Sequence, residues 1–249
     1  LSLHDALPIF QISIIMKHTL LIKDWLSSFL SLLFPRCCVV CGRPLAKGEE
    51  CICTVCNINL PRTNYHLRKD NPVERLFWGQ IPLERATSFF FYEKGSDFRL
   101  ILHRLKYGGQ KEIGAIMGRY MAAELLSSNF FQGIDVIIPI PLHKKKQQIR
   151  GYNQSEWIAR GIAAVTGIPI DTESILRKKN TETQTRKSVF ERRDNVEGIF
   201  ELQHPETLAG KHILIVDDVL TTGSTTLACA SCLVNVEGIR ISILTLATA

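Results

Sequence analysis

The sequence predicts an α/β domain with a parallel sheet and helices on both faces, preceded by a small N-terminal zinc-ribbon module. Two observations lead to this fold class. Short apolar runs typical of buried strands alternate along the chain with segments whose apolar residues recur at helical spacing. Near the amino terminus, six of the eight cysteines fall between Cys37 and Cys56, in a segment too short to bury a core of its own.

The composition is that of a globular, soluble protein. Of 249 residues, 45% are hydrophobic and 22% are charged, and the length suffices for one sizeable domain and a small module. The net charge of +6 favours an anionic partner, either a phosphorylated sugar or a nucleic acid, although a mildly basic protein without such a partner has the same charge. Basic residues are concentrated in His143–Arg150 and Arg177–Arg193, and we interpret both segments as loops.

Residues 1–15 are not expected to belong to the fold. The chain begins with Leu, its first Met is Met16, and residues 1–9 look like translated sequencing-adapter DNA, so residues 1–15 are interpreted as a non-native extension. Leu20–Phe34 is apolar at helical spacing but interrupted by charges, which predicts an amphipathic helix and no membrane span. We expect a cytoplasmic location, with the helix and cysteine module in residues 16–65 and the α/β domain in residues 85–249.

The early cysteines have the spacing of a metal site. Cys38 and Cys41 form one pair with two residues between them, and Cys53 and Cys56 form another. Four thiolates favour tetrahedral zinc, and with no open position on the metal the site is expected to be structural. Disulfides and a redox pair are the alternatives, the first disfavoured in a reducing compartment and the second lacking a thioredoxin-like helix. Cys37 and Cys51 remain without a role, and either could replace a neighbouring ligand.

The predicted elements of the main domain alternate as a doubly wound sheet requires. Strands are expected at 86–92, 134–138, 210–216 and 238–246, and helices at 97–107, 112–127, 154–166 and 224–235. Gly108 and Gly109 separate the first two helices, and Gly167 ends the third. Cys229 and Cys232, on the last helix, are interpreted as packing residues.

Polar residues follow the apolar run 213–216 in an informative order. Asp217 and Asp218 come first, and a turn rich in hydroxyl groups and glycine, Thr221–Thr225, then opens a helix. Backbone N–H groups and hydroxyls of this turn suit a phosphate, whereas the two acids would repel it and suit vicinal sugar hydroxyls or a bridging Mg²⁺. The pattern predicts a ribose 5-phosphate site at a strand end. The alternative is an ordinary connecting loop, which the paired acids and five matched turn residues argue against.

This order resembles the loop that binds 5-phosphoribosyl 1-pyrophosphate (PRPP) in type I phosphoribosyltransferases. The resemblance implies that Asp217 and Asp218 hold the ribose 2- and 3-hydroxyls. It also implies a 5-phosphate cradle made of Thr221, Thr222, Gly223, Ser224 and Thr225. Thr221 stands where purine-salvage members carry an Asp that acts as base, and because Thr is a poor base, purine salvage by that mechanism is disfavoured.

A longer series of motifs is similar to the ComF family, the competence-associated, phosphoribosyltransferase-like proteins of bacteria. From about Phe34 to the C-terminus the chain carries, in order, the cysteine module, Leu105–Gly109, Pro139–His143, Arg150–Gln154, Arg177–Phe200 and the PRPP loop. The resemblance implies a type I phosphoribosyltransferase-like sheet. It makes the loop after Ile138 a pyrophosphate loop and Arg177–Phe200 a hood over the site.

PRPP carries several negative charges, so we expect cations beyond Mg²⁺ to bind it. Arg150 and Lys106 are candidates in the main domain, and Arg177 and Arg192 are candidates in the hood, which also contributes Gln184 to the predicted site. Lys145, Lys146, Lys178 and Lys179 are interpreted as a solvated face.

Three functions remain open from the sequence. The first is transfer of ribose 5-phosphate from PRPP with Mg²⁺ to an unidentified acceptor. The second is a catalytically inactive PRPP-fold module that binds single-stranded DNA during uptake in natural transformation, and the third is a scaffold for a DNA-translocating helicase. The DNA setting and the helicase are implied by the family resemblance alone.

Overall fold

A computed structural model describes residues 35–178 and 198–249, and residue contacts divide the chain into two compact units, Leu1–Thr54 and Val55–Ala249. The expected amphipathic helix at Leu20–Phe34 therefore lies outside the described residues. In the first unit, Cys37 and Pro44 form an isolated antiparallel bridge, and the Val39 N–H donates to the Cys51 carbonyl at 2.8 Å. In the described part of this unit, residues 35–54, these bonds connect short turns rather than continuous strands.

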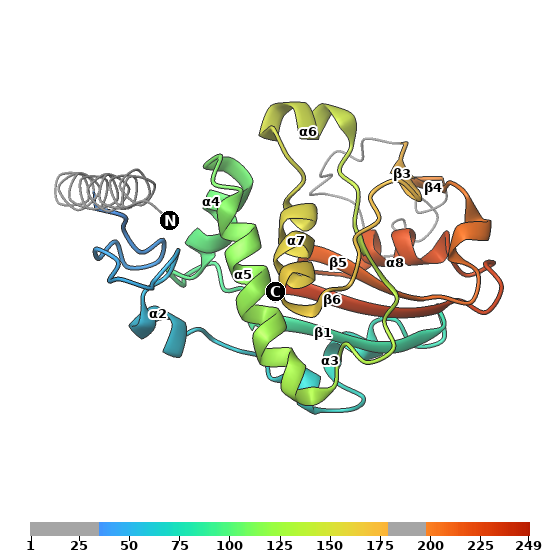
Figure 1. Cartoon of the computed structure of the whole chain (residues 1–249), viewed down its shortest axis with the longest axis horizontal. Coiled ribbons are helices and arrows are strands. Elements are labelled where there is room, and N and C mark those ends of the chain that lie inside the picture. Colours follow the sequence, from blue (N-terminus) through green and yellow to red (C-terminus); the bar gives the residue numbers. More distant parts are fainter. Residues whose placement is uncertain (1–34, 179–197) are drawn as a thin grey trace, which may run out of the picture. The chain divides into compact units, whose positions relative to one another are not determined.

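A parallel sheet of four strands forms the centre of the second unit (Figure 1). The strands are β1 (Leu83–Phe91), β2 (Val136–Pro139), β5 (His212–Leu220) and β6 (Arg240–Thr248), in the order β1-β6-β5-β2. All three strand pairs are parallel, as predicted. Beside β2, Ile137 also bridges Ile170, so the sheet edge is extended by one extra chain segment. β5 is an interior strand, hydrogen-bonded on both sides.

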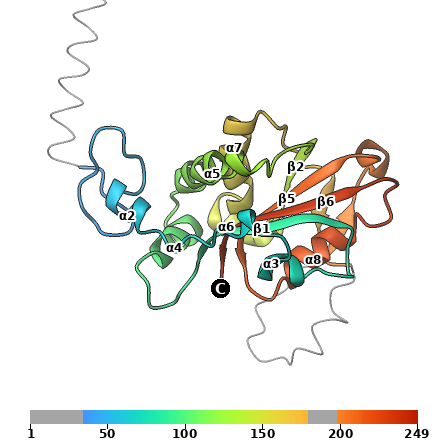
Figure 2. The same cartoon turned by 90° about the horizontal axis from the view of Figure 1, so that it is seen from below.

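Helices cover both faces of this sheet (Figure 2). One face carries α5 (Glu112–Leu125) and α7 (Gln154–Thr166), and the other carries α3 (Pro72–Arg75) and α8 (Ser224–Ser231). On the α8 side, alternate strand residues such as Ile213, Ile215 and Ile243 form a core with Cys229 and Leu233. Burial raises the pKa of Cys229 well above its usual value, which keeps it a thiol and supports its interpretation as a packing residue.

α5 and α7 cross with their backbones almost in contact, because small residues line the crossing. A Cβ atom placed on Gly118 would lie 2.2 Å from the Ile158 carbonyl oxygen, and one on Gly161 would lie 2.1 Å from the Ala115 carbonyl oxygen. Any larger side chain must push the helices apart. The close crossing fixes the position of α7, which carries residues of the site at its first turn.

The remaining elements are short. They are α2 (Thr54–Ile58), α4 (Arg99–Tyr107), α6 (Lys144–Arg150), the 3₁₀ turns Tyr65–Leu67, Leu126–Ser128 and Pro205–Leu208, and an antiparallel pair of β3 (Ile175–Arg177) and β4 (Phe200–Leu202). Within the described ranges, no helix combines the length and apolar character needed to cross a membrane.

The basic segment 143–150, which we predicted to be a loop, is instead a helix over Lys144–Arg150. Its ends explain the difference. The His143 side chain accepts a hydrogen bond from the Lys145 N–H, and Gly151 ends the helix in the left-handed conformation with φ 79°. His is an uncommon N-cap, so a run of lysines between His and Gly carries little helical signal in the sequence.

Candidate functional site

Two neighbouring acids lie near the carboxyl end of β5. The sequence predicted that the strand ends at Val216, but β5 continues through Asp217 and Asp218 to Leu220. The ladder with β6 sustains it, pairing Asp217 with Thr245 and Leu220 with Thr248. Both acids are therefore held on a strand backbone rather than on a loop.

Each carboxylate has a partner from a different element. The Lys106 Nζ, in the last turn of α4, lies 2.9 Å from Asp218 Oδ1, with the side chains of Lys106 and Asp218 only 23% and 13% exposed. Asp217 Oδ1 accepts hydrogen bonds from the Ser155 hydroxyl at 3.0 Å and from the Asp218 N–H at 2.8 Å. α4, β5 and the start of α7 thus meet at this acid pair.

The electrostatics of the pair favour a cation or a hydroxyl ligand. Burial, followed by the charge of Asp218, raises the pKa of Asp217 to about 7, against the opposing effects of the Asp218 N–H, Lys106 and Ser155. A carboxyl group with this pKa is only partly ionised at neutral pH, and an additional positive charge would favour its ionised form. The pair is therefore poised to gain a counterion.

The turn after β5 presents polar groups to solvent. Thr221, Thr222 and Thr225 are exposed, and the hydroxyls of Thr222 and Ser224 lie 2.8 Å apart. Gly223 has φ 75°, and a Cβ there would lie 3.4 Å from the ring of Phe77, so both conformation and space favour glycine. No side chain in the described ranges caps the start of α8, which leaves its first N–H groups available to an anion.

The predicted cation Arg150 is held in place by several contacts. Its Nη1 donates to Gln154 Oε1 at 2.7 Å, and its guanidinium carbon lies 5.5 Å from the centre of the Tyr107 ring. The Tyr152 hydroxyl donates to the Leu105 carbonyl oxygen, which ties this segment to α4. Because Gln154 adjoins Ser155, the Arg150 segment and the acid pair share the first turn of α7.

Asn153 fixes that first turn to the end of β2. Its side-chain amide donates to the Ile140 carbonyl oxygen at 3.0 Å, and its side-chain oxygen accepts the Ser155 N–H at 3.1 Å. Ser155 was missed by the sequence reasoning, although it directly follows the Arg150–Gln154 motif. Its role becomes visible only when β5 and α7 are brought together.

The hood residues are partly described. Arg177 lies on β3, its guanidinium carbon is 5.2 Å from the Phe200 ring centre, and burial lowers its pKa while the charge of Asp217 acts in the opposite direction. Gln184 and Arg192 lie outside the described residues. The structure thus brings Lys106, Asp217 and Asp218 into one site, with Arg177 electrostatically coupled to it.

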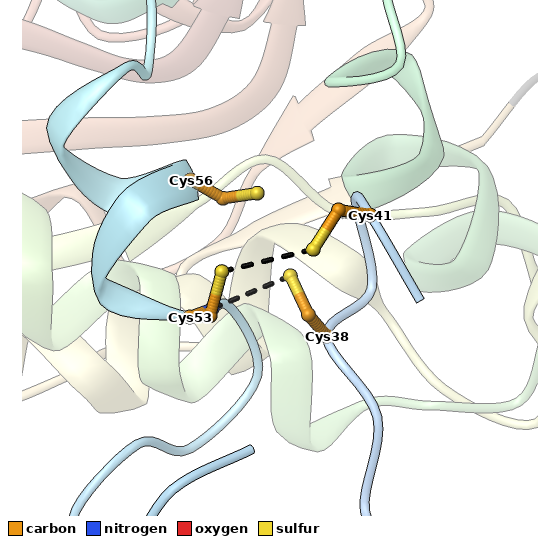
Figure 3. A group of neighbouring side chains, drawn as sticks. All are labelled: Cys38, Cys41, Cys53 and Cys56. Carbon is orange, nitrogen blue, oxygen red and sulfur yellow. Dashed lines mark hydrogen bonds between the residues drawn. The ribbon is translucent and has the colours of Figure 1, made fainter. Parts of the chain in front are cut away.

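The four predicted cysteine ligands converge (Figure 3). The sulfur atoms of Cys38, Cys41, Cys53 and Cys56 all lie within 4.8 Å of one another, and the sulfurs of Cys41 and Cys53 are 3.7 Å apart. Tetrahedral zinc with bonds of about 2.3 Å requires sulfur separations of about 3.8 Å, so the cluster fits a metal.

Local hydrogen bonds favour the thiolate form in this cluster. The Cys53 N–H donates to the Cys38 sulfur at 3.3 Å. Burial raises the pKa of Cys38, but backbone N–H groups led by that of Cys41 outweigh it and bring the pKa to about 7. Cys37 is exposed and Cys51 is buried, and neither belongs to the cluster.

The chain is similar to one family model and to several bacterial proteins. Residues 154–249 match the family model described as a phosphoribosyl transferase domain. The chain is 32% identical over 206 residues to DNA utilization protein YhgH of Escherichia coli O157:H7, covering 77% of this chain and 87% of that protein. It is also similar to Competence protein F of Haemophilus influenzae, at 31% identity over 51% of this chain and 57% of that protein. For Competence protein ComFC of Bacillus subtilis the identity is 26%, over 84% of this chain and 82% of that protein.

Proposed function

The chain belongs to the ComF family of phosphoribosyltransferase-like proteins, and from this premise we propose that it binds PRPP with Mg²⁺ at the carboxyl edge of its sheet and acts in DNA uptake. The observation that carries the proposal is the placement of the acid pair near the end of β5, one short turn before α8, whose first N–H groups no described side chain caps. The names of the relatives support the DNA setting.

Different residues would bind different groups of the ligand. The 5-phosphate would bind to the turn Thr221–Thr225 and to the first N–H groups of α8, where the helix dipole favours an anion. Asp217 and Asp218 would accept hydrogen bonds from the ribose hydroxyls, while their Oδ1 atoms contact Ser155 and Lys106. The carboxylates of Asp217 and Asp218 could also hold the Mg²⁺ that accompanies the ligand, and this ion would offset the negative charge of the pyrophosphate.

Turnover would break the bond between the anomeric carbon and pyrophosphate and form one to an acceptor. Positive charge then builds at the anomeric carbon, and negative charge on the departing pyrophosphate is stabilised by Arg150 and Lys106. Thr221, exposed and without an acidic group, supplies no base for a purine acceptor. A screen of nucleobases and amines for pyrophosphate release distinguishes this enzyme from a binding module without turnover.

The core of the proposal is tested by calorimetry with PRPP and Mg²⁺. The wild type is expected to give a saturable heat, and the double variant Asp217→Asn, Asp218→Asn is expected to lose it. Asp135→Asn is the matched control, because Asp135 Oδ2 accepts the His212 N–H at the opposite, amino-terminal edge of the sheet, where an Asn oxygen can replace it. Equal heats from the wild type and the double variant would contradict the proposal.

The alternative is a PRPP-fold module that contacts single-stranded DNA or a helicase. Of the two tyrosines near basic segments, Tyr107 is 67% exposed whereas Tyr152 is 8% exposed, so base stacking would depend on Tyr107. Direct DNA binding through phosphates requires affinity that falls linearly on a plot of log K against log salt. A flat plot would exclude it and leave the PRPP site as the route to a role in uptake.

We also propose that the cysteine cluster holds structural zinc. Metal analysis of the purified protein is expected to find about one zinc per chain. Cys38→Ser should lower this content, whereas Cys37→Ser should not, because Cys37 is exposed and lies outside the cluster. A folded wild-type protein free of metal would contradict the assignment.

A further inference from the structure

Arg150 is oriented by its surroundings although it ends a solvent-exposed helix. Ile149, its neighbour on α6, is 85% exposed, whereas Arg150 is half-buried between Gln154 and Tyr107. A long flexible cation on a surface helix normally samples many conformations, and two defined contacts on one guanidinium restrict it. Holding the Arg150 guanidinium in one orientation would be useful if it contacts a ligand.

The ring of Tyr107 packs against the Arg150 guanidinium. Its ring is 67% exposed, lies 5.5 Å from the Arg150 guanidinium carbon and packs against the His103 ring at 5.3 Å. The preceding residue, Lys106, is paired with Asp218, so the helix that carries the ring is fixed to the acid pair. The Tyr152 bond to Leu105 fixes the Arg150 segment to the same helix turn. The Tyr107 ring, the Arg150 segment and the acid pair are therefore all connected to the last turn of α4.

Gln154 provides the polar contact. Its side chain is buried, its oxygen accepts from Arg150, and its amide nitrogen has no hydrogen-bond partner among the residues the structure describes. Burying an unsatisfied amide nitrogen is unfavourable, and the hydrogen bond from Arg150 to the side-chain oxygen partly offsets that cost. A carboxylate there would hold Arg150 more strongly but would neutralise it. A neutral amide orients the guanidinium and leaves its charge for an anionic ligand.

We propose that Tyr107 and Gln154 are positioning residues that hold the Arg150 guanidinium ready for the pyrophosphate group of PRPP. The inference rests on the proposed function, because Arg150 is its pyrophosphate contact. It predicts a specific selectivity. Disturbing either positioning residue should weaken ligands that carry pyrophosphate and leave ribose 5-phosphate, which lacks it, unaffected.

The first test measures the affinities of PRPP and ribose 5-phosphate, each with Mg²⁺, for Tyr107 variants. Tyr107→Leu should weaken PRPP binding about two- to fivefold, the range for an exposed cation–π contact, without changing ribose 5-phosphate binding. Tyr107→Phe retains the ring and should restore PRPP affinity. Because Tyr107 is largely exposed, neither change should disturb folding, which circular dichroism checks.

The second test asks whether Tyr107 acts through Arg150. In an Arg150→Ala background, Tyr107→Leu should cause no further loss of PRPP affinity, whereas independent contacts would give additive losses. Gln154→Glu should weaken PRPP selectively by neutralising Arg150.

The outcomes separate the two proposals. A wild type that binds neither ligand refutes the proposed function and this inference with it. A wild type that binds PRPP, with an unchanged ratio of PRPP to ribose 5-phosphate affinity in Tyr107→Leu, or additive losses in the Arg150→Ala background, refutes the inference alone.

Discussion

Replacing Asp217 by Asn should stabilise the unliganded protein at alkaline pH. The pKa of Asp217 is raised from 3.8 to about 7, chiefly by burial and then by the charge of Asp218. The folded state therefore binds this proton more tightly than the unfolded state, and stability falls as pH rises from about 4 to about 7. Above pH 7 the full loss is present, and Asn, which cannot ionise, avoids it.

The magnitude follows from the same numbers. Each pH unit between the folded and unfolded pKa values corresponds to about 1.4 kcal/mol, so the ceiling on the gain is about 4 kcal/mol. Relaxation of the site reduces this, and we expect roughly 1–4 kcal/mol at pH 8. The Asn side-chain oxygen can still accept the hydrogen bonds from Ser155 and from the residue 218 N–H, so these two bonds are kept.

Urea unfolding of wild type and Asp217→Asn at pH 8 and at pH 5 measures this effect. The gain should be large at pH 8 and much smaller at pH 5. Lys106→Met is the contrasting variant, because it leaves the two carboxylates without their cation and should destabilise by about 1–3 kcal/mol at pH 8. A variant Asp217→Asn that is less stable than wild type at pH 8, or equally stabilised at both pH values, would refute the reasoning.

Two further predictions concern binding and packing. The affinity for PRPP with Mg²⁺ should fall about tenfold per pH unit below pH 7 and level off above it, because the ligand needs Asp217 ionised; a pH-independent affinity from pH 5 to 8 would contradict this. Gly161→Ala should destabilise by about 1–3 kcal/mol in urea unfolding, since its Cβ would lie 2.1 Å from the Ala115 carbonyl oxygen. The matched control, Gly95→Ala, has no atom within 4 Å of the added Cβ and should be close to neutral.

The order of strands and helices in the main domain could be predicted because residues such as glycine mark where individual elements end. Gly167 ends α7 in the left-handed conformation, with φ 73°, as its position after the apolar periodicity predicted. The extension of β5 through Asp217 could not be predicted in the same way, because acids are depleted in strands and the pairing with Thr245 depends on a distant part of the chain.

The candidate site was predicted in its residue types and less well in its contacts. Lys106 was expected to meet the ligand, but its pairing with Asp218 depends on where α4 ends relative to β5, which is a tertiary property. Ser155 lies just outside the Arg150–Gln154 motif. Tyr107 lies inside the Leu105–Gly109 motif, but the motif does not show its contact with Arg150. Side chains that act through one another are identified by distances, which the sequence does not contain.

The acids on β5 have a consequence for how this family can diversify. Their strand lies between β6 and β2. Asp217 is paired with Thr245 of β6, and the pairing with β2 ends at Val216, directly before it, so a backbone shift at these residues would disturb the ladder. If the proposed site binds PRPP, natural variation would change the acceptor through the surrounding helices and turns rather than at the two acids. We expect members with different acceptors to superpose closely at these two residues and to diverge around Tyr107.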